Sequence, residues 1–157
     1  MEESIRQTQE AAGGGSSLDD CLREAFTLEE KDWSQYSPLT LAYIGDAVYD
    51  LMIRTVMVKQ GNTQTARLHQ RTTALVKASS QAELMAALMP YLTPEEQSVY
   101  RRGHNAKPYH TAKNASRREY LEATGFEALM GYLYLKGEYR RMVDLVKLGL
   151  EESGYAV

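Results

Sequence analysis

The sequence predicts an all-α protein. Apolar residues recur at helical spacing, as in Leu41, Ile44, Val48, Leu51 and Met52. Helix-start signals (Ser or Thr caps) and helix-stop signals (Gly and Pro) separate these segments from one another. No segment shows the period-two alternation of a half-buried strand. An all-helical bundle is therefore expected.

Side-chain caps and glycines set the expected helix boundaries. A short helix is expected over Leu18–Phe26, capped by Ser17. Ser37 followed by Pro38 predicts a helix that runs through Val58 to Gly61. Thr63 is the expected cap of a helix ending near Lys77. Three capping boxes, in which a Ser or Thr and a Glu each satisfy a backbone N–H, predict further starts at Ser80–Glu83, Thr93–Glu96 and Ser116–Glu119.

The later helices are expected to end near Pro90, Gly103 and Gly137, and a last helix covers Glu138 to about Glu152. The segment from His104 to Ala115 contains Pro108 and is predicted to be a loop.

Length and composition fit one ordinary globular domain. The chain has 157 residues, of which 43% are hydrophobic and 25% charged. Residues 1–17 end in a Gly- and Ser-rich run and are predicted to be a flexible acidic leader, with a single domain over residues 18–157. Cys21 is the single cysteine, so no internal disulfide is expected. No apolar run approaches the length of a membrane span, and the polar N-terminus does not resemble a signal peptide. A cytoplasmic protein is the default expectation.

The net charge of −3 conceals an asymmetry. Residues 1–33 hold nine acidic and three basic side chains, a net charge of −6, which leaves +3 on the remainder. No acid occurs between Asp50 and Glu83, or from Arg101 to Arg118. Such acid-free basic stretches favour a cationic surface for nucleic acid, although a merely solvated face gives the same pattern.

Two acids lie inside apolar helical segments. Asp46 falls within Leu41–Val48 and Glu127 within Ala123–Gly131, both beside glycines. Burying a carboxylate is costly without a partner, and a helical glycine costs about 1 kcal/mol relative to alanine. Close helix approach would explain the glycines. The acids could be an Arg-paired or surface feature, or they could hold a cation such as Mg²⁺ between two helices.

Asp50 lies on the same helix face as Asp46 and could join that acidic cluster. Pairing with Arg54, four residues further on, is favoured instead.

These two segments carry a family resemblance. Leu41 to Val48 (L-A-Y-I-G-D-A-V) resembles the signature helix of the ribonuclease III family, commonly L-E-F-L-G-D-A-V. Ala123 to Leu135 (A-T-G-F-E-A-L-M-G-Y-L-Y-L) resembles that family's second motif, commonly A-D-x-F-E-A-L-x-G-A-x-Y-L. The segment Arg101–Lys107 is most similar to the Mini-ribonuclease III branch. The resemblance covers about Ser37 to Glu152.

The resemblance implies an RNase III endonuclease domain working as a homodimer, with a catalytic valley along the dimer interface. It implies a hydrolase that cuts double-stranded RNA and leaves 5′-phosphate and 3′-hydroxyl ends. The branch has no separate double-stranded-RNA-binding domain and matures the 23S ribosomal RNA precursor in bacteria. Asp46 falls on the family's signature aspartate and Glu127 on its metal-binding glutamate, so both are expected to be catalytic ligands of Mg²⁺.

Two positions depart from the family pattern. Ala42 replaces the usual glutamate of the first motif, and Thr124 replaces the usual aspartate of the second. Fewer ligands favour one tightly held ion, with a second recruited by the RNA phosphate.

The basic stretches suit the phosphates and 2′-hydroxyls that duplex RNA presents. The residues expected to bind RNA are Arg101, Arg102, His104, Asn105, Lys107, Lys113, Asn114, Arg117 and Arg118. Arg67 and Arg71 are weaker candidates. The main alternative is a catalytically inactive RNase III fold that binds RNA or the ribosome. A helical protein-interaction module is a third possibility.

Overall fold

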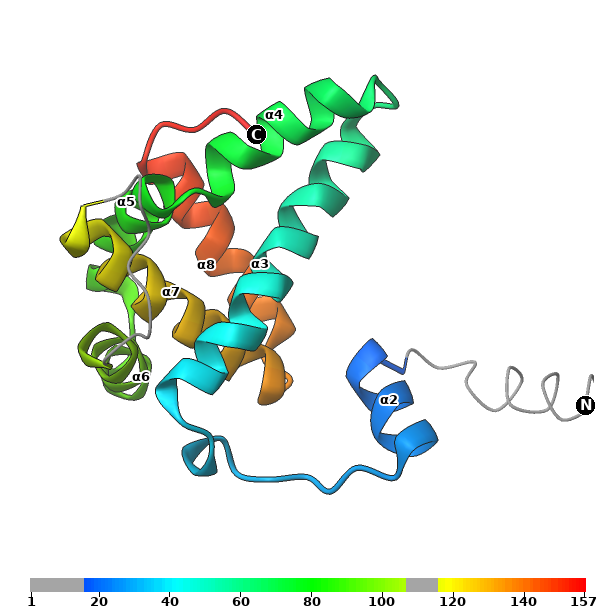
Figure 1. Cartoon of the computed structure of the whole chain (residues 1–157), viewed down its shortest axis with the longest axis vertical. Helices are drawn as coiled ribbons and strands as arrows, with labels where there is room; N and C mark the ends of the chain where they lie inside the picture. The colour runs from blue at the N-terminus through cyan, green and yellow to red at the C-terminus, as the bar shows by residue number, and fades with distance from the viewer. Residues whose placement is uncertain (1–15, 107–115) are drawn as a thin grey trace, which may run out of the picture. The chain divides into compact units, whose positions relative to one another are not determined.

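The computed structural model of the chain describes residues 16–106 and 116–157. Within those residues the secondary structure is helical, without a β-strand, which confirms the all-α prediction (Figure 1). The chain divides into two compact units, residues 1–32 and residues 33–157. The predicted leader over residues 1–17 lies almost wholly outside the described residues, and its boundary stays a prediction.

The first unit contains the short helix α2, Leu18–Phe26. Its start is fixed by a reciprocal capping box. The Ser17 hydroxyl accepts a hydrogen bond from the Asp20 backbone N–H, and the Asp20 carboxylate accepts one from the Ser17 N–H. This confirms the predicted cap at Ser17.

The second unit contains six α-helices among the described residues, preceded by the 3₁₀ turn η1 (Trp33–Gln35). They are α3 (Pro38–Gln60), α4 (Thr65–Val76), α5 (Ala78–Leu88), α6 (Pro94–Asn105), α7 (Arg117–Leu135) and α8 (Tyr139–Glu152), with the 3₁₀ turn η2 (Met89–Tyr91) between α5 and α6. None of the described helices is both long enough and apolar enough to cross a bilayer.

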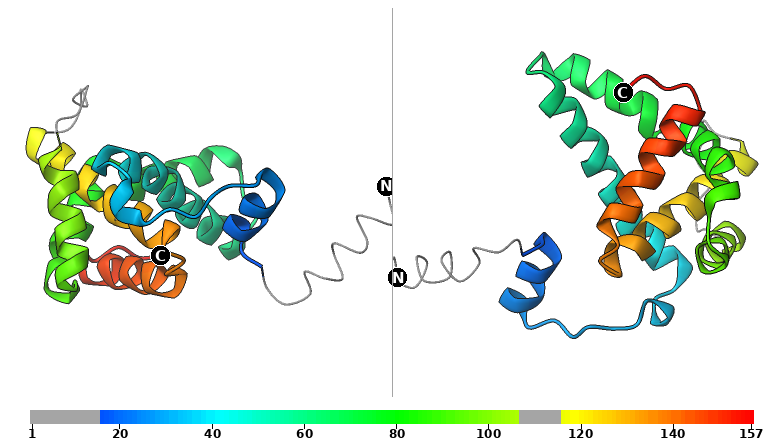
Figure 2. Two further views of the ribbon diagram at one scale, coloured as in Figure 1. Left: turned by 90° about the horizontal axis from the view of Figure 1, so that it is seen from below. Right: turned by 180° about the vertical axis from the view of Figure 1, so that it is seen from behind.

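Helix α7 is the centre of this unit. It packs most extensively against α3, and it also contacts α6, α5 and α8 (Figures 1 and 2). Ten of its residues are buried in succession or nearly so, which explains why its sequence is apolar on every side rather than amphipathic. Tyr49 and Phe126 meet edge to face in the core, with ring centroids 5.0 Å apart. The fold is therefore organised around the segment that carries the second motif.

Most predicted helix starts are confirmed. Ser37 caps α3 with Pro38 in its first turn, and Thr93 forms a complete capping box with Glu96 at the start of α6. Ser116 caps α7 by accepting from the Glu119 backbone N–H at 3.1 Å.

Two predicted caps are wrong. Helix α4 begins at Thr65 rather than after Thr63, and Gln64 precedes it without a side-chain cap. Helix α5 begins at Ala78, two residues before the predicted box at Ser80. Ser80 donates instead to the Ala74 carbonyl at 2.5 Å, and Gln81 donates to the Val76 carbonyl at 2.7 Å. Both side chains satisfy the last carbonyls of the preceding helix, so they tie α4 to α5.

Candidate functional site

The crossing of α3 and α7 is close enough that only glycine fits at the contact. A Cβ atom on Gly45 would lie 1.7 Å from the Glu127 carbonyl oxygen, and one on Gly131 would lie 2.0 Å from the Leu41 carbonyl oxygen. Both neighbours are backbone atoms, which a rotamer change cannot move. The expectation that helical glycines mark close helix approach is confirmed, and their intrinsic cost is offset by packing.

This crossing brings the two predicted carboxylates together. Asp46 follows Gly45 on α3, and Glu127 is the α7 residue whose carbonyl contacts Gly45. Asp46 is exposed while Glu127 is half-buried. Burial, a hydrogen bond to Asp46 and the charge of that carboxylate together raise the pKa of Glu127 to about 9, with burial the largest of the three causes. The two side chains therefore interact directly at the margin of the core.

No basic side chain neutralises this pair in the part of the chain that the structure describes. Neither carboxylate has an Arg, Lys or His within ion-pair distance there. Asp50, which could have joined the cluster, is bound to Arg54 with Oδ1 and Nε 3.0 Å apart, as favoured from the sequence. Among the described residues, therefore, no arginine compensates the half-buried Glu127.

The structure also shows what occupies the two positions that depart from the family pattern. Ala42, one turn before Asp46, is buried. Thr124, three residues before Glu127, is also buried, and its hydroxyl donates to the Tyr120 carbonyl at 2.9 Å. Within residues 16–106 and 116–157, no group of three His, Cys, Asp or Glu side chains could hold a metal. The donor set that the described residues provide is therefore two carboxylates.

This donor set suits Mg²⁺. That ion is usually bound through one or two carboxylates, while waters and substrate phosphates complete its shell. A cation between Asp46 and Glu127 would also compensate two like charges that otherwise repel. A structural zinc site needs four protein ligands and does not fit.

A second close crossing joins α6 to α7. A Cβ on Gly125 would lie 2.6 Å from the Tyr100 ring, and one on Gly103 would lie 2.7 Å from the Ala128 Cβ atom. The last turn of α6 is thereby held against the same helix that carries Glu127.

The predicted RNA-binding residues lie at the end of α6 and the start of α7. Arg101, Arg102, Asn105, Arg117 and Arg118 are exposed, and His104 is half-buried. Helix α6 continues through His104 to Asn105, two residues beyond its predicted end. Lys107, Lys113 and Asn114 lie outside the described residues.

A local hydrogen bond and an ion pair organise part of this surface. The His104 Nδ1 and the Asn105 Oδ1 are 3.1 Å apart, and the Arg118 Nε lies 3.3 Å from Glu122 Oε1. Arg117 is ten residues before Glu127, about 15 Å along the α7 axis.

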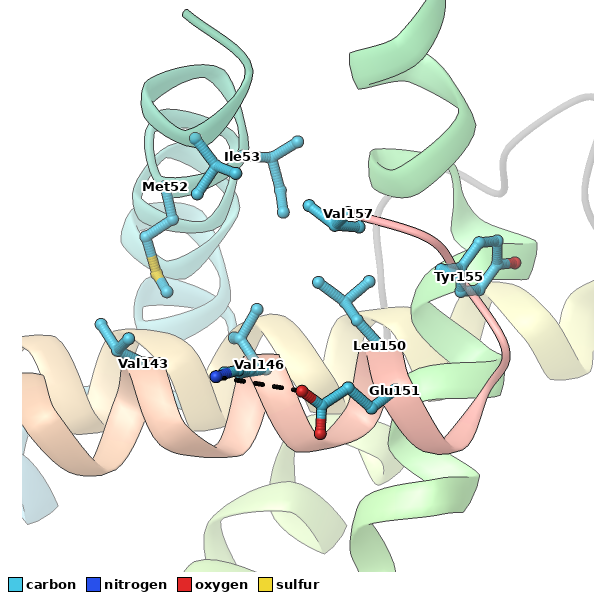
Figure 3. Close-up of a pocket in the computed structure, with 10 residues that line it drawn as sticks. Met52, Ile53, Val143, Val146, Leu150, Glu151, Tyr155 and Val157 are labelled. Atoms are coloured by element: carbon cyan, nitrogen blue, oxygen red, sulfur yellow. Dashed lines mark ion pairs between the residues drawn. The ribbon is translucent and has the colours of Figure 1, made fainter. Parts of the chain in front are cut away.

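An apolar groove between α3 and α8 was not anticipated from the sequence. Its volume is about 280 Å³, and Lys147 and Glu151, 4.0 Å apart, lie on its rim (Figure 3). Its apolar lining comes chiefly from Met52, Ile53, Val56, Val143, Val146 and Leu150. Helical spacing identifies apolar positions but does not say which of them remain open after packing.

The fold and the paired carboxylates together define a class of protein. Residues 39–138 match the model of the ribonuclease III domain, a span that includes both motifs and both carboxylates. The chain belongs to the ribonuclease III family, as the resemblance of the two motifs predicted. Membership of this family supports an RNase III-type endoribonuclease, which is a hydrolase.

The relatives narrow the comparison within the family. The chain is 45% identical over 128 residues to the Mini-ribonuclease 3 of Clostridium tetani, covering 81% of this chain and 83% of the relative. It is 43% identical to the Mini-ribonuclease 3 of Enterococcus faecalis, and the match covers 79% of this chain and 96% of that relative. A crystal structure of a Fusobacterium nucleatum protein superposes with a TM-score of 0.70 at 28% identity, covering 77% of this chain and 97% of that one. The predicted similarity to Mini-ribonuclease III is confirmed.

Proposed function

We propose that this protein is a Mg²⁺-dependent endoribonuclease that hydrolyses phosphodiester bonds in double-stranded RNA. The observation that carries the proposal is the meeting of Asp46 and Glu127 from separate helices, without a basic partner among the described residues. A structural pair of acids would destabilise the fold for no gain, whereas a metal site requires such a pair.

Asp46 and Glu127 would hold the ion. A bound Mg²⁺ would lower the pKa of an attacking water and offset the charge that develops on the phosphate. Glu127 must give up the proton that its raised pKa favours before its carboxylate can serve as a ligand. Exposed Asp46 presents its carboxylate toward solvent, the side from which a large duplex substrate can approach.

The ends of α6 and α7 would bind the duplex backbone. Arginines at these ends offer planar groups that bond phosphate oxygens, and the Asn105 amide and His104 imidazole add hydrogen bonds. The same role is proposed for Lys107, Lys113 and Asn114. Binding through phosphates predicts a steep loss of affinity with added salt.

The cleavage products and the natural substrate are inferred from the relatives within the family. We propose cleavage to 5′-phosphate and 3′-hydroxyl ends, in maturation of the 23S ribosomal RNA precursor in the bacterial cytoplasm. The bacterial Mini-ribonuclease 3 relatives support it.

A homodimer is also proposed. Tyr43, Leu51 and Val58 on α3 are 81%, 57% and 60% exposed, and a separate apolar groove lies between α3 and α8. Exposed apolar side chains and an open apolar groove on one helix support contact with a second copy of the chain.

The test is incubation with a precursor stem of 23S ribosomal RNA, with Mg²⁺ or with EDTA, followed by mapping of the cut ends. We expect cleavage with Mg²⁺ only, and ends that carry 5′-phosphate and 3′-hydroxyl groups. The Asp46→Asn protein should bind the stem and leave it intact. Binding of the stem without cleavage by the wild-type protein would instead identify an inactive RNase III fold that acts as an RNA-binding protein.

A further inference from the structure

Tyr120, in the first turns of α7, is a half-buried tyrosine whose side chain has no evident role in the fold. Within residues 16–106 and 116–157 it neither packs against the hydrophobic core nor pairs with another aromatic ring. Its hydroxyl also has no hydrogen-bond partner there. The other half-buried tyrosines of the described chain all pack against the core, and they are Tyr36, Tyr100, Tyr134, Tyr139 and Tyr155.

The backbone of Tyr120 is nevertheless fixed on both sides. Its N–H donates to the Ser116 carbonyl at 3.0 Å, and its own carbonyl accepts from the Thr124 hydroxyl at 2.9 Å. Ser116 is the residue that caps α7. The helix therefore sets the direction of the Cα–Cβ bond of Tyr120, and an unused hydroxyl is presented from a rigid element.

Tyr120 lies on the same face of α7 as the carboxylate site. Tyr120, Thr124 and Glu127 follow the spacing i, i+4 and i+7, which aligns side chains along one face of a helix. Thr124 takes the position of the usual aspartate in the second motif of the family. Tyr120 is two turns before Glu127, about 10 Å along the helix axis, in the direction of the N-terminus of α7.

That direction leads to the surface proposed to bind the RNA backbone. A Cβ on Gly103 would lie 3.3 Å from the Thr124 carbonyl oxygen, so the last turn of α6 lies beside this part of α7. His104 and Asn105 follow Gly103 directly, and Arg117 precedes Tyr120 by three residues. Tyr120 therefore lies between that surface and the carboxylates.

The chemistry of a phenol hydroxyl suits a ribose better than a phosphate or a base. It can both donate and accept a hydrogen bond, and so can a ribose 2′-hydroxyl. Phosphates are matched more closely by the guanidinium groups on either side of the strand junction between α6 and α7. Stacking of the ring on a base would require the duplex to unstack, which costs free energy.

We propose that the Tyr120 hydroxyl binds a ribose 2′-hydroxyl close to the cut and thereby favours RNA over DNA. This inference rests on the proposed function, because it places Tyr120 on the duplex that Asp46 and Glu127 cleave. It has a specific consequence. Removal of that single 2′-hydroxyl should weaken binding only while residue 120 keeps its own hydroxyl.

The experiment pairs Tyr120→Phe with a matched control, Tyr91→Phe. Tyr91 is an exposed tyrosine of η2, at the opposite end of α6 from His104, and its hydroxyl also has no partner in the described chain. Each protein is titrated with an all-ribose duplex and with duplexes that lack one 2′-hydroxyl, moved nucleotide by nucleotide across the cut. Binding is measured without divalent cations, so that no duplex is cleaved.

Wild type should lose about 2- to 12-fold in affinity at one deoxy position, the usual effect of one hydrogen bond. Tyr120→Phe should bind the all-ribose duplex more weakly by a similar factor and lose nothing more at that position. At the other positions it should respond as wild type does, and Tyr91→Phe should follow wild type throughout. Such coupling between one protein group and one RNA group is not produced by a merely structural role.

Equal binding of the all-ribose duplex by Tyr120→Phe and wild type would overturn the proposal. So would a loss that is the same at every deoxy position, which would indicate a phosphate contact or an indirect effect. Thermal unfolding of Tyr120→Phe should match wild type, and a lower midpoint would show that the hydroxyl is structural. Failure of the proposed function would appear separately, as absence of Mg²⁺-dependent cleavage by the wild-type protein.

Discussion

Two covered glutamates of the same helical unit have opposite environments. Glu96 on α6 receives two bonds from Arg141 on α8, with Nη2 to Oε1 at 2.7 Å and Nε to Oε2 at 2.9 Å. The Thr93 backbone N–H adds a third at 2.9 Å. Burial alone would raise the pKa of Glu96, but the bonds from Arg141 and Thr93 outweigh it and lower that pKa.

Glu127 on α7 faces a carboxylate instead of a guanidinium. Burial and Asp46 both raise its pKa, and no basic side chain among the described residues opposes them. The comparison shows that Glu96 stabilises the fold through its partner Arg141. Glu96 is compensated by Arg141, whereas Glu127 has no basic partner among the described residues, and a bound cation would supply the missing positive charge.

The largest difference between the Asp46–Glu127 pair and Glu96 should appear in the rate of RNA cleavage. Asp46→Asn and Glu127→Gln should each lower cleavage of duplex RNA more than about 100-fold, since loss of even outer-shell partners of a metal costs 10–100-fold. Glu96→Gln should retain cleavage at temperatures where it stays folded, because Glu96 is engaged by Arg141. Single-turnover rates with saturating Mg²⁺ provide the measurement. Cleavage at the wild-type rate by Asp46→Asn or Glu127→Gln would show that the altered carboxylate is not a catalytic metal ligand.

The next contrast concerns the glycine that brings the carboxylates together. Gly45→Ala places a methyl group against the Glu127 carbonyl, so the helices must separate, at an expected cost of about 3 kcal/mol or more. The cleavage rate should fall together with the stability, because separation of the helices moves the carboxylates of Asp46 and Glu127 apart. Urea unfolding measures the stability. Gly61→Ala is the matched control, since nothing lies within 4 Å of its added methyl group. Equal stability of the two variants would contradict the close crossing.

A smaller difference should separate the two glutamates in stability. Glu96→Gln should lower the free energy of unfolding by about 1–3 kcal/mol, because it weakens charge-assisted bonds to Arg141. Glu127→Gln should leave the stability unchanged or raise it in the absence of Mg²⁺, since an amide removes the cost of holding a proton on a half-buried carboxyl group beside Asp46. Chemical denaturation in EDTA compares them. Equal losses would mean that Glu127 is as structural as Glu96.

The smallest expected effect is on pH dependence. The lowered pKa of Glu96 means that its stabilisation is present above the ordinary glutamate pKa and is lost as the pH falls through the lowered value. The raised pKa of Glu127 changes the stability in the opposite direction as the pH varies. Without divalent cations, the folded state retains a proton that the unfolded state releases, so stability falls as the pH rises toward about 9.

The slope from Glu127 should stay below about 1.4 kcal/mol per pH unit, the limit for one proton. Unfolding at pH 6 and pH 8 in EDTA measures it, and Glu127→Gln should flatten the difference. A wild-type protein whose stability rises between these values as steeply as it is predicted to fall would reverse the sign and refute the account of the pair.

Local sequence determined most helix boundaries and the identity of the two carboxylates. Caps at Ser37, Thr93 and Ser116 act within one turn, so they are readable without knowing the fold. An acid within an apolar helical segment is unusual anywhere, and the match of both segments to one family's motifs identified Asp46 and Glu127 as the pair to test. The same local rules failed at Ser80, where the side chain bonds to the end of the preceding helix instead of capping its own.

Only the tertiary structure decided which buried acid is compensated. Glu96 and Arg141 are 45 residues apart, and no spacing rule connects them. Gly45 and Gly131 revealed a need for close approach, but the contact of Gly45 with the Glu127 carbonyl emerged only when α3 crossed α7. The physical reason is range: capping and periodicity act over a few residues of chain, whereas burial and charge compensation depend on which distant side chains packing brings within a few ångströms.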